Sequence, residues 1–148
     1  MLTHKLSLEQ EAHDQDVLCV HTVLPSYMFV FRLNRLLGLS LQRSEEDITT
    51  PPSSQGFAVY EYDCAVMQQS WRVVENHSTG TQNSATNTLF AQTEQQIYLF
   101  PELDRPDILV CVNGLTNAVI KKVSALGRVI SCYRLPKTLN TIKKQLTF

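Results

Sequence analysis

The sequence predicts a single α+β domain, in which one mainly antiparallel sheet of about eight strands carries two principal helices on one face. Many short runs of β-branched or alternating apolar residues are typical of strands. Two longer segments, near 27–37 and 116–126, are predicted to be helices, and each ends at a glycine, while the apolar residues of the tail 138–148 also have near-helical spacing. The length of 148 residues is ordinary for one domain built on one core.

The first half of the chain combines a buried strand, a helix and a hairpin. Val17–Val23 is continuously apolar and β-branched, which predicts a strand buried on both faces. A helix is predicted from about Tyr27 to Leu37, with Ser26 as its N-cap and Gly38 in the left-handed position at its C-terminus. Other strands are predicted at 6–8, 39–42, 57–63 and 71–76, of which the last two form a hairpin.

The second half begins with a polar segment and continues with three strands and a helix. Residues 77–95 are rich in Thr, Asn, Gln and Ser and contain little apolar surface, so we expect a mobile excursion there. Strands are predicted at 96–100, 108–112 and 129–135, with the second helix at about 116–126. The remaining tail, 138–148, is basic.

Two parts of the chain resemble each other in the order of their elements. Residues 16–43 and residues 107–134 each contain a strand, a helix, a glycine and a second strand that ends in arginine. This echo fits an old two-fold duplication. It fits equally two unrelated strand–helix–strand units, which are common. The sequence alone leaves both explanations open.

Composition and charge disfavour several broad classes of protein. The formal net charge is -1 and the pI is about 6.4, so no overall basic field attracts nucleic acid. No run of about 18 apolar residues occurs, and the N-terminus lacks a signal-peptide pattern, so we expect no membrane partner. The four cysteines are widely spaced, which is typical of buried thiols in a reducing compartment. We therefore expect a cytoplasmic protein.

No set of residues has the spacing of a catalytic or metal site. Cys19 and His21 share one strand face, but a metal needs at least one further ligand, and alternate strand residues do not face each other as a catalytic pair must. His77 and Ser78 could join Asp63 or Glu75 in a triad, but no Gly-x-Ser-x-Gly nucleophile elbow accompanies them. We predict no catalytic residue, no metal and no cofactor, and the sequence favours a non-enzymatic role.

One segment and its context resemble a named family. Phe100-Pro101-Glu102, followed after three residues by Pro106-Asp107-Ile108, resembles the bacterial IPExxxVDY signature. Pro101, Glu102 and Asp107 match the pattern, while Phe100, Pro106 and Ile108 depart from it. The helix around 32–39, the strand at 57–62 and the tail ending at Phe148 also resemble that family. The resemblance implies a small cytosolic protein of uncharacterised role and supplies no catalytic residues.

The signature segment also carries our candidates for ligand binding. Glu102 and Asp107, together with Asn76, could line a cleft for a small molecule or a substrate. The simpler interpretation is a strand connector, because Pro101 cannot donate to a sheet ladder and Asp107 favours a turn. The sequence favours the connector.

Basic residues concentrate in the last third of the chain, where they could contact RNA. No interleaved aromatic residues provide a stacking platform beside them, so a solvated face is the more typical role. The residues concerned are Lys121, Lys122, Arg128, Arg134, Lys137, Lys143 and Lys144.

The start of the first helix is more apolar than the surface of a soluble domain requires. Tyr27–Phe31 is apolar on all sides, and such a helix must be covered on every face. Tyr27, Met28 and Phe31 are therefore candidates for self-association, with the long polar loop as the alternative cover. We predict a non-enzymatic interaction module that forms a homodimer or binds another protein. A ligand-binding protein or enzyme, and RNA contact through the C-terminal lysines, are the alternatives.

Overall fold

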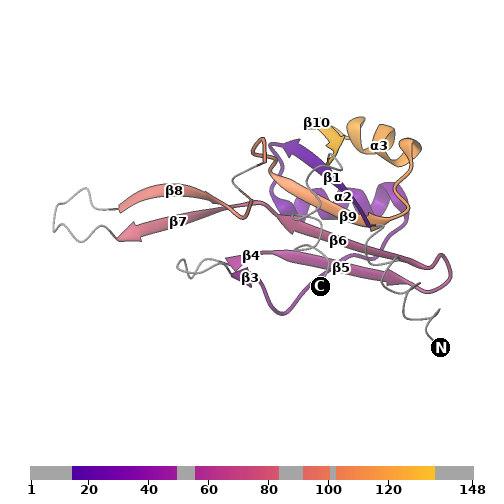
Figure 1. The fold of residues 1–148 in the computed structure, drawn as a ribbon, viewed down its shortest axis with the longest axis horizontal. Coiled ribbons are helices and arrows are strands. Elements are labelled where there is room, and N and C mark those ends of the chain that lie inside the picture. Colours follow the sequence, from indigo (N-terminus) through magenta and orange to yellow (C-terminus); the bar gives the residue numbers. More distant parts are fainter. Residues whose placement is uncertain (1–14, 50–55, 84–91, 101–102, 136–148) are drawn as a thin grey trace, which may run out of the picture.

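The computed structural model describes residues 15–49, 56–83, 92–100 and 103–135, and within these ranges it contains two helices and ten strands (Figure 1). The α+β class predicted from the sequence is confirmed. The elements are β1 (Gln15–Thr22), α2 (Ser26–Leu37), β2 (Gln42–Arg43), β3 (Ile48–Thr49), β4 (Gly56–Phe57), β5 (Val59–Cys64), β6 (Gln69–Glu75), β7 (His77–Asn83), β8 (Gln92–Tyr98), β9 (Ile108–Asn113), α3 (Asn117–Ser124) and β10 (Val129–Arg134).

The centre of the fold is a six-stranded sheet in which every neighbouring pair is antiparallel. Its strand order is β10-β1-β9-β6-β5-β2. β1 and β9 lie next to each other inside the sheet and pair Leu18 with Val110. Val17–Val20 and Ile108–Val112 are buried throughout, as continuous apolar runs predict for strands covered on both faces.

The two helices lie in two related connections. In the first unit, α2 follows β1 and the chain returns to the centre of the sheet as β6, with β9 lying between β1 and β6. In the second unit, α3 joins β9 to β10, with β1 lying between them. This is the split β-α-β arrangement of ferredoxin-like topologies, with β2 to β5 inserted after α2. The strands that correspond in the two units of the structure are therefore not all those that the two similar sequence segments, 16–43 and 107–134, suggested. The counterpart of β10 is β6, because β2 lies at the far edge of the sheet.

Each face of the sheet has its own hydrophobic cluster. Phe29 and Leu33 of α2 and Val123 of α3 pack against Leu18 and Val110, so both helices cover the same face, as predicted. The opposite face contains no helical residue among those described. Its members are Val17, Cys19, Val59, Val74, Phe100, Leu103, Leu109, Cys111 and Leu135.

A two-stranded ribbon projects from the sheet. β7 and β8 pair in antiparallel register from His77 with Tyr98 to Asn83 with Gln92 (Figure 1). No strand was predicted between residues 77 and 95, because this segment contains little apolar surface that could be buried. Backbone pairing does not require that surface, and the threonines in this segment favour extended structure. The mobility expected for 77–95 stays a prediction, and residues 84–91 lie outside the described residues.

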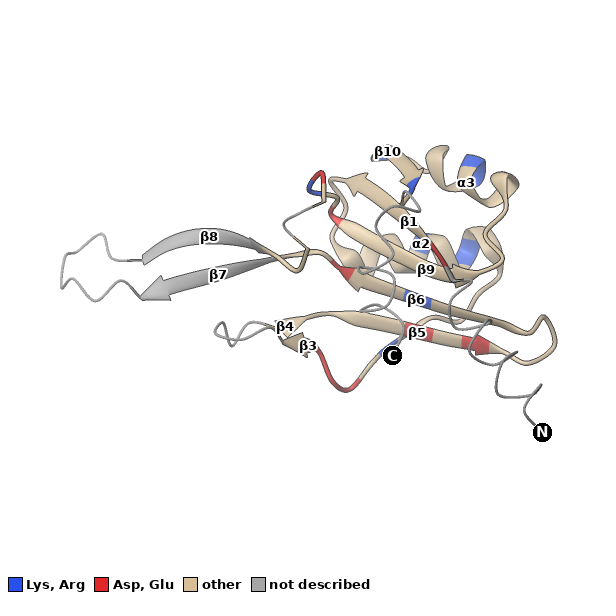
Figure 2. Cartoon of the chain, in the orientation of Figure 1, with Lys and Arg blue, Asp and Glu red and all other residues tan. Residues whose placement is uncertain are grey.

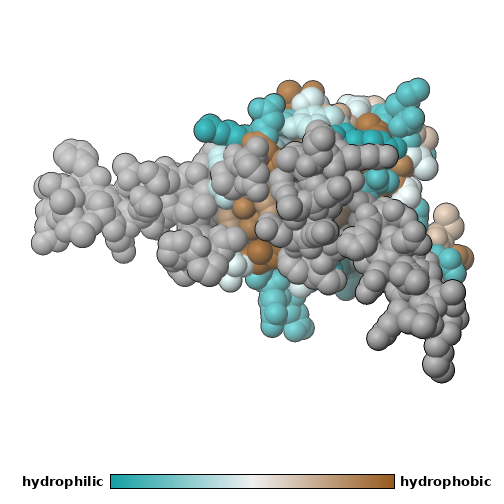
Figure 3. All heavy atoms as spheres, in the orientation of Figure 1, coloured by the Kyte–Doolittle hydropathy of each residue, from teal (hydrophilic) through white to brown (hydrophobic). Residues whose placement is uncertain are grey.

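Several smaller differences concern the ends of elements. The strand predicted at 39–42 is reduced to β2, and the segment after it contains β3, which pairs with β4. The β5–β6 hairpin is confirmed, and its tip exposes Val66 (92%) and Met67 (67%). Figure 3 shows hydrophobic atoms at that end of the molecule. The strand predicted at 6–8 and the basic tail lie outside the described residues. Among the described helices, none is long and apolar enough to cross a membrane.

Candidate functional site

Helix α2 has one side that secures the core. Pro25 occupies the N-cap with extended backbone, and its carbonyl accepts the Phe29 N–H at 3.0 Å. Gly38 ends the helix at a φ of 65°, in the left-handed position that the sequence predicted. Phe29, Val30 and Leu33 are buried against the sheet.

The other side of α2 exposes large apolar side chains. Tyr27 is 63% exposed and Phe31 is 57% exposed, and their i, i+4 spacing places them next to each other on the helix surface. Val23, just before the helix, is also exposed. Met28 is only half-buried and packs against the helix-side core. Of the three residues predicted for self-association, two are thus more than half exposed and the third partly supports the core.

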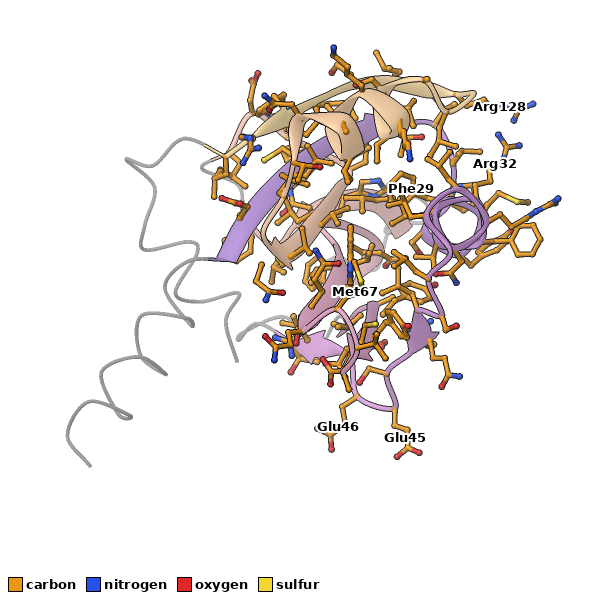
Figure 4. All side chains as sticks on the ribbon, turned by 90° about the vertical axis from the view of Figure 1, so that its right-hand side faces the viewer. Phe29, Arg32, Glu45, Glu46, Met67 and Arg128 are labelled. Atoms are coloured by element: carbon orange, nitrogen blue, oxygen red, sulfur yellow. The ribbon has the colours of Figure 1, made fainter. Side chains whose placement is uncertain are left out.

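Three arginines lie on or beside this side of α2. Arg32 Nη1 donates to the Gly127 carbonyl at 3.3 Å, and the Arg35 guanidinium carbon lies 5.8 Å from the centre of the Phe31 ring. The Val23 N–H donates to the Arg128 carbonyl at 3.3 Å. In Figure 4, Arg32 and Arg128 point away from the core while Phe29 points into it. We call this surface the outer face of α2, which consists of Val23, Tyr27, Phe31, Arg32, Arg35 and Arg128.

Asn76 lies at the junction where the chain leaves the sheet for the ribbon. Its side chain is completely buried, with Nδ2 donating to the Pro106 carbonyl at 2.8 Å and Oδ1 accepting the Phe100 N–H at 2.9 Å. Its backbone N–H donates to the Asp107 carbonyl at 3.0 Å, and its carbonyl accepts the Leu99 N–H. Asn76 therefore ties the end of β6 to both segments that precede β9.

Asp107 uses both carboxylate oxygens within the fold. Oδ2 accepts the Thr22 N–H at 2.9 Å, and Oδ1 lies 3.0 Å from His77 Nε2. The Asp107 N–H donates to the Val20 carbonyl at 2.9 Å. His77 thus pairs with Asp107, and not with Asp63 or Glu75 as considered from the sequence. The pairing joins the base of the ribbon to the start of β9 and the end of β1.

Ser26 is not the N-cap of α2, contrary to the sequence prediction. It is the first helical residue, and its buried hydroxyl donates to the Glu75 carboxylate and lies 3.3 Å from the Tyr60 hydroxyl. Glu75 also accepts the Ala58 N–H at 3.3 Å. Because these partners come from β5 and β6, tertiary contacts displace the local capping role that the sequence suggested.

Of the three residues predicted to bind a ligand, the structure describes Asn76 and Asp107. Asn76 and Asp107 do lie together, but their polar atoms bond to backbone groups and to His77. This arrangement matches the connector interpretation. Glu102 lies outside the described residues. The sequence missed the roles of Thr22 and His77, since contacts that span many residues leave no local signal.

The Cys19 and His21 pair separates into two environments. Cys19 is completely buried, and burial raises the pKa of its thiol to about 12, so it is protonated at neutral pH. His21 Nε2 lies 3.2 Å from the Tyr133 hydroxyl on the neighbouring strand. The thiol has no base that activates it among these contacts, which agrees with a structural role for both residues.

The charged residues are unevenly distributed. Neither helix contains an acidic residue, while Lys121, Lys122 and Arg128 are exposed on the helix side (Figure 2). Arg134 is engaged, since its Nη1 lies 3.5 Å from Asp16 Oδ2 and its Nη2 donates to the Leu115 carbonyl. The lysines of the predicted RNA contact that belong to the tail lie outside the described residues.

Within the described ranges, no group of three His, Cys, Asp or Glu side chains is arranged to hold a metal ion. Searches among protein-family models, curated proteins and solved structures find no match to this chain. The assignment of a function therefore depends on the surface chemistry of the molecule itself.

Proposed function

We propose that this protein is a non-enzymatic interaction module that binds a protein partner through the outer face of α2. The observation that carries the proposal is the exposure of Tyr27 and Phe31 on a helix whose opposite side already secures the core. Burial of each such side chain contributes about 1.5–3 kcal/mol, which contact with a partner can supply. Tyr, Phe and Arg are also the residue types that protein interfaces favour.

The partner is either a second copy of this chain, as the sequence predicted, or another cytoplasmic protein. Membership of the IPExxxVDY family is likewise a proposal, supported by the residues that match the signature. We do not propose ligand binding at Asn76 and Asp107, or RNA contact through Lys121 and Lys122, because no contact among the described residues favours either.

The proposal is tested by placing a photoreactive benzoylphenylalanine at Phe31 and irradiating the protein inside its host cells. We expect a covalent adduct, because a partner bound to the outer face of α2 lies within reach of that side chain. An adduct of twice the chain mass identifies a second copy, and any other mass identifies a different protein.

Met67 provides the matched control position. It is apolar and exposed, but it lies at the β5–β6 hairpin tip and not on α2. Adducts at Phe31 without adducts at Met67 support the proposal. Equal labelling at both positions, or no adduct at Phe31, contradicts it.

A further inference from the structure

We infer that the partner of the outer face of α2 is an acidic protein segment with apolar side chains, and not a second copy docked through the same face. The inference rests on the proposed function, because it assumes that this face is a binding surface. It adds the chemistry of the partner, which follows from the charges around Tyr27 and Phe31.

The outer face of α2 carries positive charge only. Arg32, Arg35 and Arg128 contribute three guanidinium groups, and the chain contains no Asp or Glu from residue 17 to 44 or from 108 to 135. Within the described ranges, none of these three arginines forms an ion pair. No described carboxylate therefore neutralises their charge, and carboxylates are the natural partners of such guanidinium groups.

The acidic residues that the structure describes lie elsewhere. Glu61 and Asp63 are exposed on β5, and Glu45, Glu46 and Asp47 occupy the segment after β2 (Figure 2). In Figure 4, Glu45 and Glu46 lie at the opposite end of the molecule from Arg32 and Arg128. Among the described residues, these carboxylates are thus separated from the arginines of the outer face, although Glu61 pairs with Arg72 and Asp47 pairs with Arg43.

This separation disfavours a symmetric dimer through α2. In a two-fold contact the same patch of each copy meets its equivalent, so guanidinium groups from both copies would share one interface without a carboxylate. Like charges placed together in an interface repel and oppose association. A head-to-tail contact with the acidic edge of another copy avoids the repulsion, but it produces rings or open chains and not a two-fold dimer through α2.

A short acidic segment fits the face better. Tyr27 and Phe31 offer two adjacent apolar anchors, and arginines flank them, so a partner with alternating acidic and apolar side chains satisfies both features. Interfaces between proteins enrich Tyr, Phe and Arg and deplete Lys, and the outer face contains no lysine. Nucleic acids and anionic membranes rely instead on larger sets of basic contacts.

The test is a fluorescence-anisotropy titration with a labelled peptide in which Asp and Glu alternate with Leu and Phe. The comparison probes are the same peptide with Asn and Gln in place of Asp and Glu, a single-stranded oligouridylate, and vesicles of phosphatidylserine with phosphatidylcholine. We expect saturable binding of the acidic peptide that weakens as salt rises. We expect binding of the amide peptide to be about tenfold weaker or more.

Variants then locate the binding. Phe31→Ser alone, and Arg32→Gln combined with Arg35→Gln, should each weaken acidic-peptide binding about tenfold. Met67→Ser should leave it unchanged, and circular dichroism confirms that each variant is folded. Failure of the acidic peptide to bind, equal binding of both peptides, or stronger binding of the oligouridylate or vesicles would overturn the inference.

Light scattering separates this failure from that of the proposed function. A closed dimer that Phe31→Ser dissociates would overturn the acidic partner while supporting a binding role for the outer face. Absence of peptide binding, of self-association and of photoadducts at Phe31 would contradict both proposals.

Discussion

At the residue scale, the junction between sheet and ribbon depends on the buried amide of Asn76. Its two side-chain hydrogen bonds satisfy the Phe100 N–H and the Pro106 carbonyl. Without them these backbone groups would stay buried and unpaired, which is more costly than the loss of a hydrogen bond in water. Asn113 offers a useful contrast, because it makes two similar bonds, to the Ser70 N–H and the Gln68 carbonyl, in an exposed setting.

We predict that Asn76→Ala lowers the free energy of unfolding by about 2–4 kcal/mol, because two buried backbone groups lose their partners. Asn113→Ala should cost about 1 kcal/mol or less, because water replaces its bonds. Urea unfolding of both variants measures the difference. Equal costs for the two substitutions would contradict the role assigned to Asn76.

The four thiols should differ in reactivity because their surroundings differ. Burial raises the pKa of both Cys19 and Cys111 to about 12. The pKa of Cys64 is instead lowered, first by the Met67 backbone N–H and then by the Tyr62 hydroxyl, both of which stabilise the thiolate.

At neutral pH we therefore expect Cys64 to react first with a chromogenic disulfide, and its rate to rise at a lower pH than that of an ordinary thiol. Cys19 and Cys111 should react only after unfolding. Mass spectrometry of the labelled peptides identifies the site. Modification of Cys19 before Cys64 would show that the assigned environments are wrong.

At the element scale, helix α2 serves two purposes with its two sides. Its C-terminal limit was predicted from local chemistry, since glycine suits the left-handed position that Gly38 occupies directly after the last turn. The role of Ser26 was not predicted, because Glu75 and Tyr60 lie far away in the sequence. The ribbon was missed for a related reason. β7 and β8 pair with each other through their backbones, and their sequences lack the alternating apolar pattern that predicts a strand.

Phe29 and Phe31 test whether one side of α2 stabilises the core while the other side does not. Phe29→Ala should lower the free energy of unfolding by about 3–5 kcal/mol, because it opens a cavity in the core. Phe31→Ala should stay within about 1 kcal/mol of the wild type, since an exposed ring and its contact with Arg35 contribute little to stability.

Thermal or urea unfolding of the two variants checks this prediction. A large loss of stability in Phe31→Ala would mean that the outer face supports the fold, and that its exposure is not reserved for a partner.

At the scale of the whole molecule, the sequence allowed the fold class to be predicted but not the strand order. Alternating and continuous apolar runs indicated strands, and the two helices were assigned to one face. The pairing of β1 with β9 and β10 joins segments about ninety residues or more apart, for which no local pattern exists. The sequence likewise indicated that Tyr27 and Phe31 needed cover, but not that Met28 would pack inward or that Arg128 would join them.

The most direct test of the account is hydroxyl-radical footprinting of Tyr27 and Phe31 in the purified protein and in an extract of its host cells. We predict that oxidation of both rings falls in the extract, where a partner covers the outer face of α2, while oxidation of Met67 at the hairpin tip does not change. Equal oxidation of Tyr27 and Phe31 in the two conditions would contradict the central claim that this face is a binding surface.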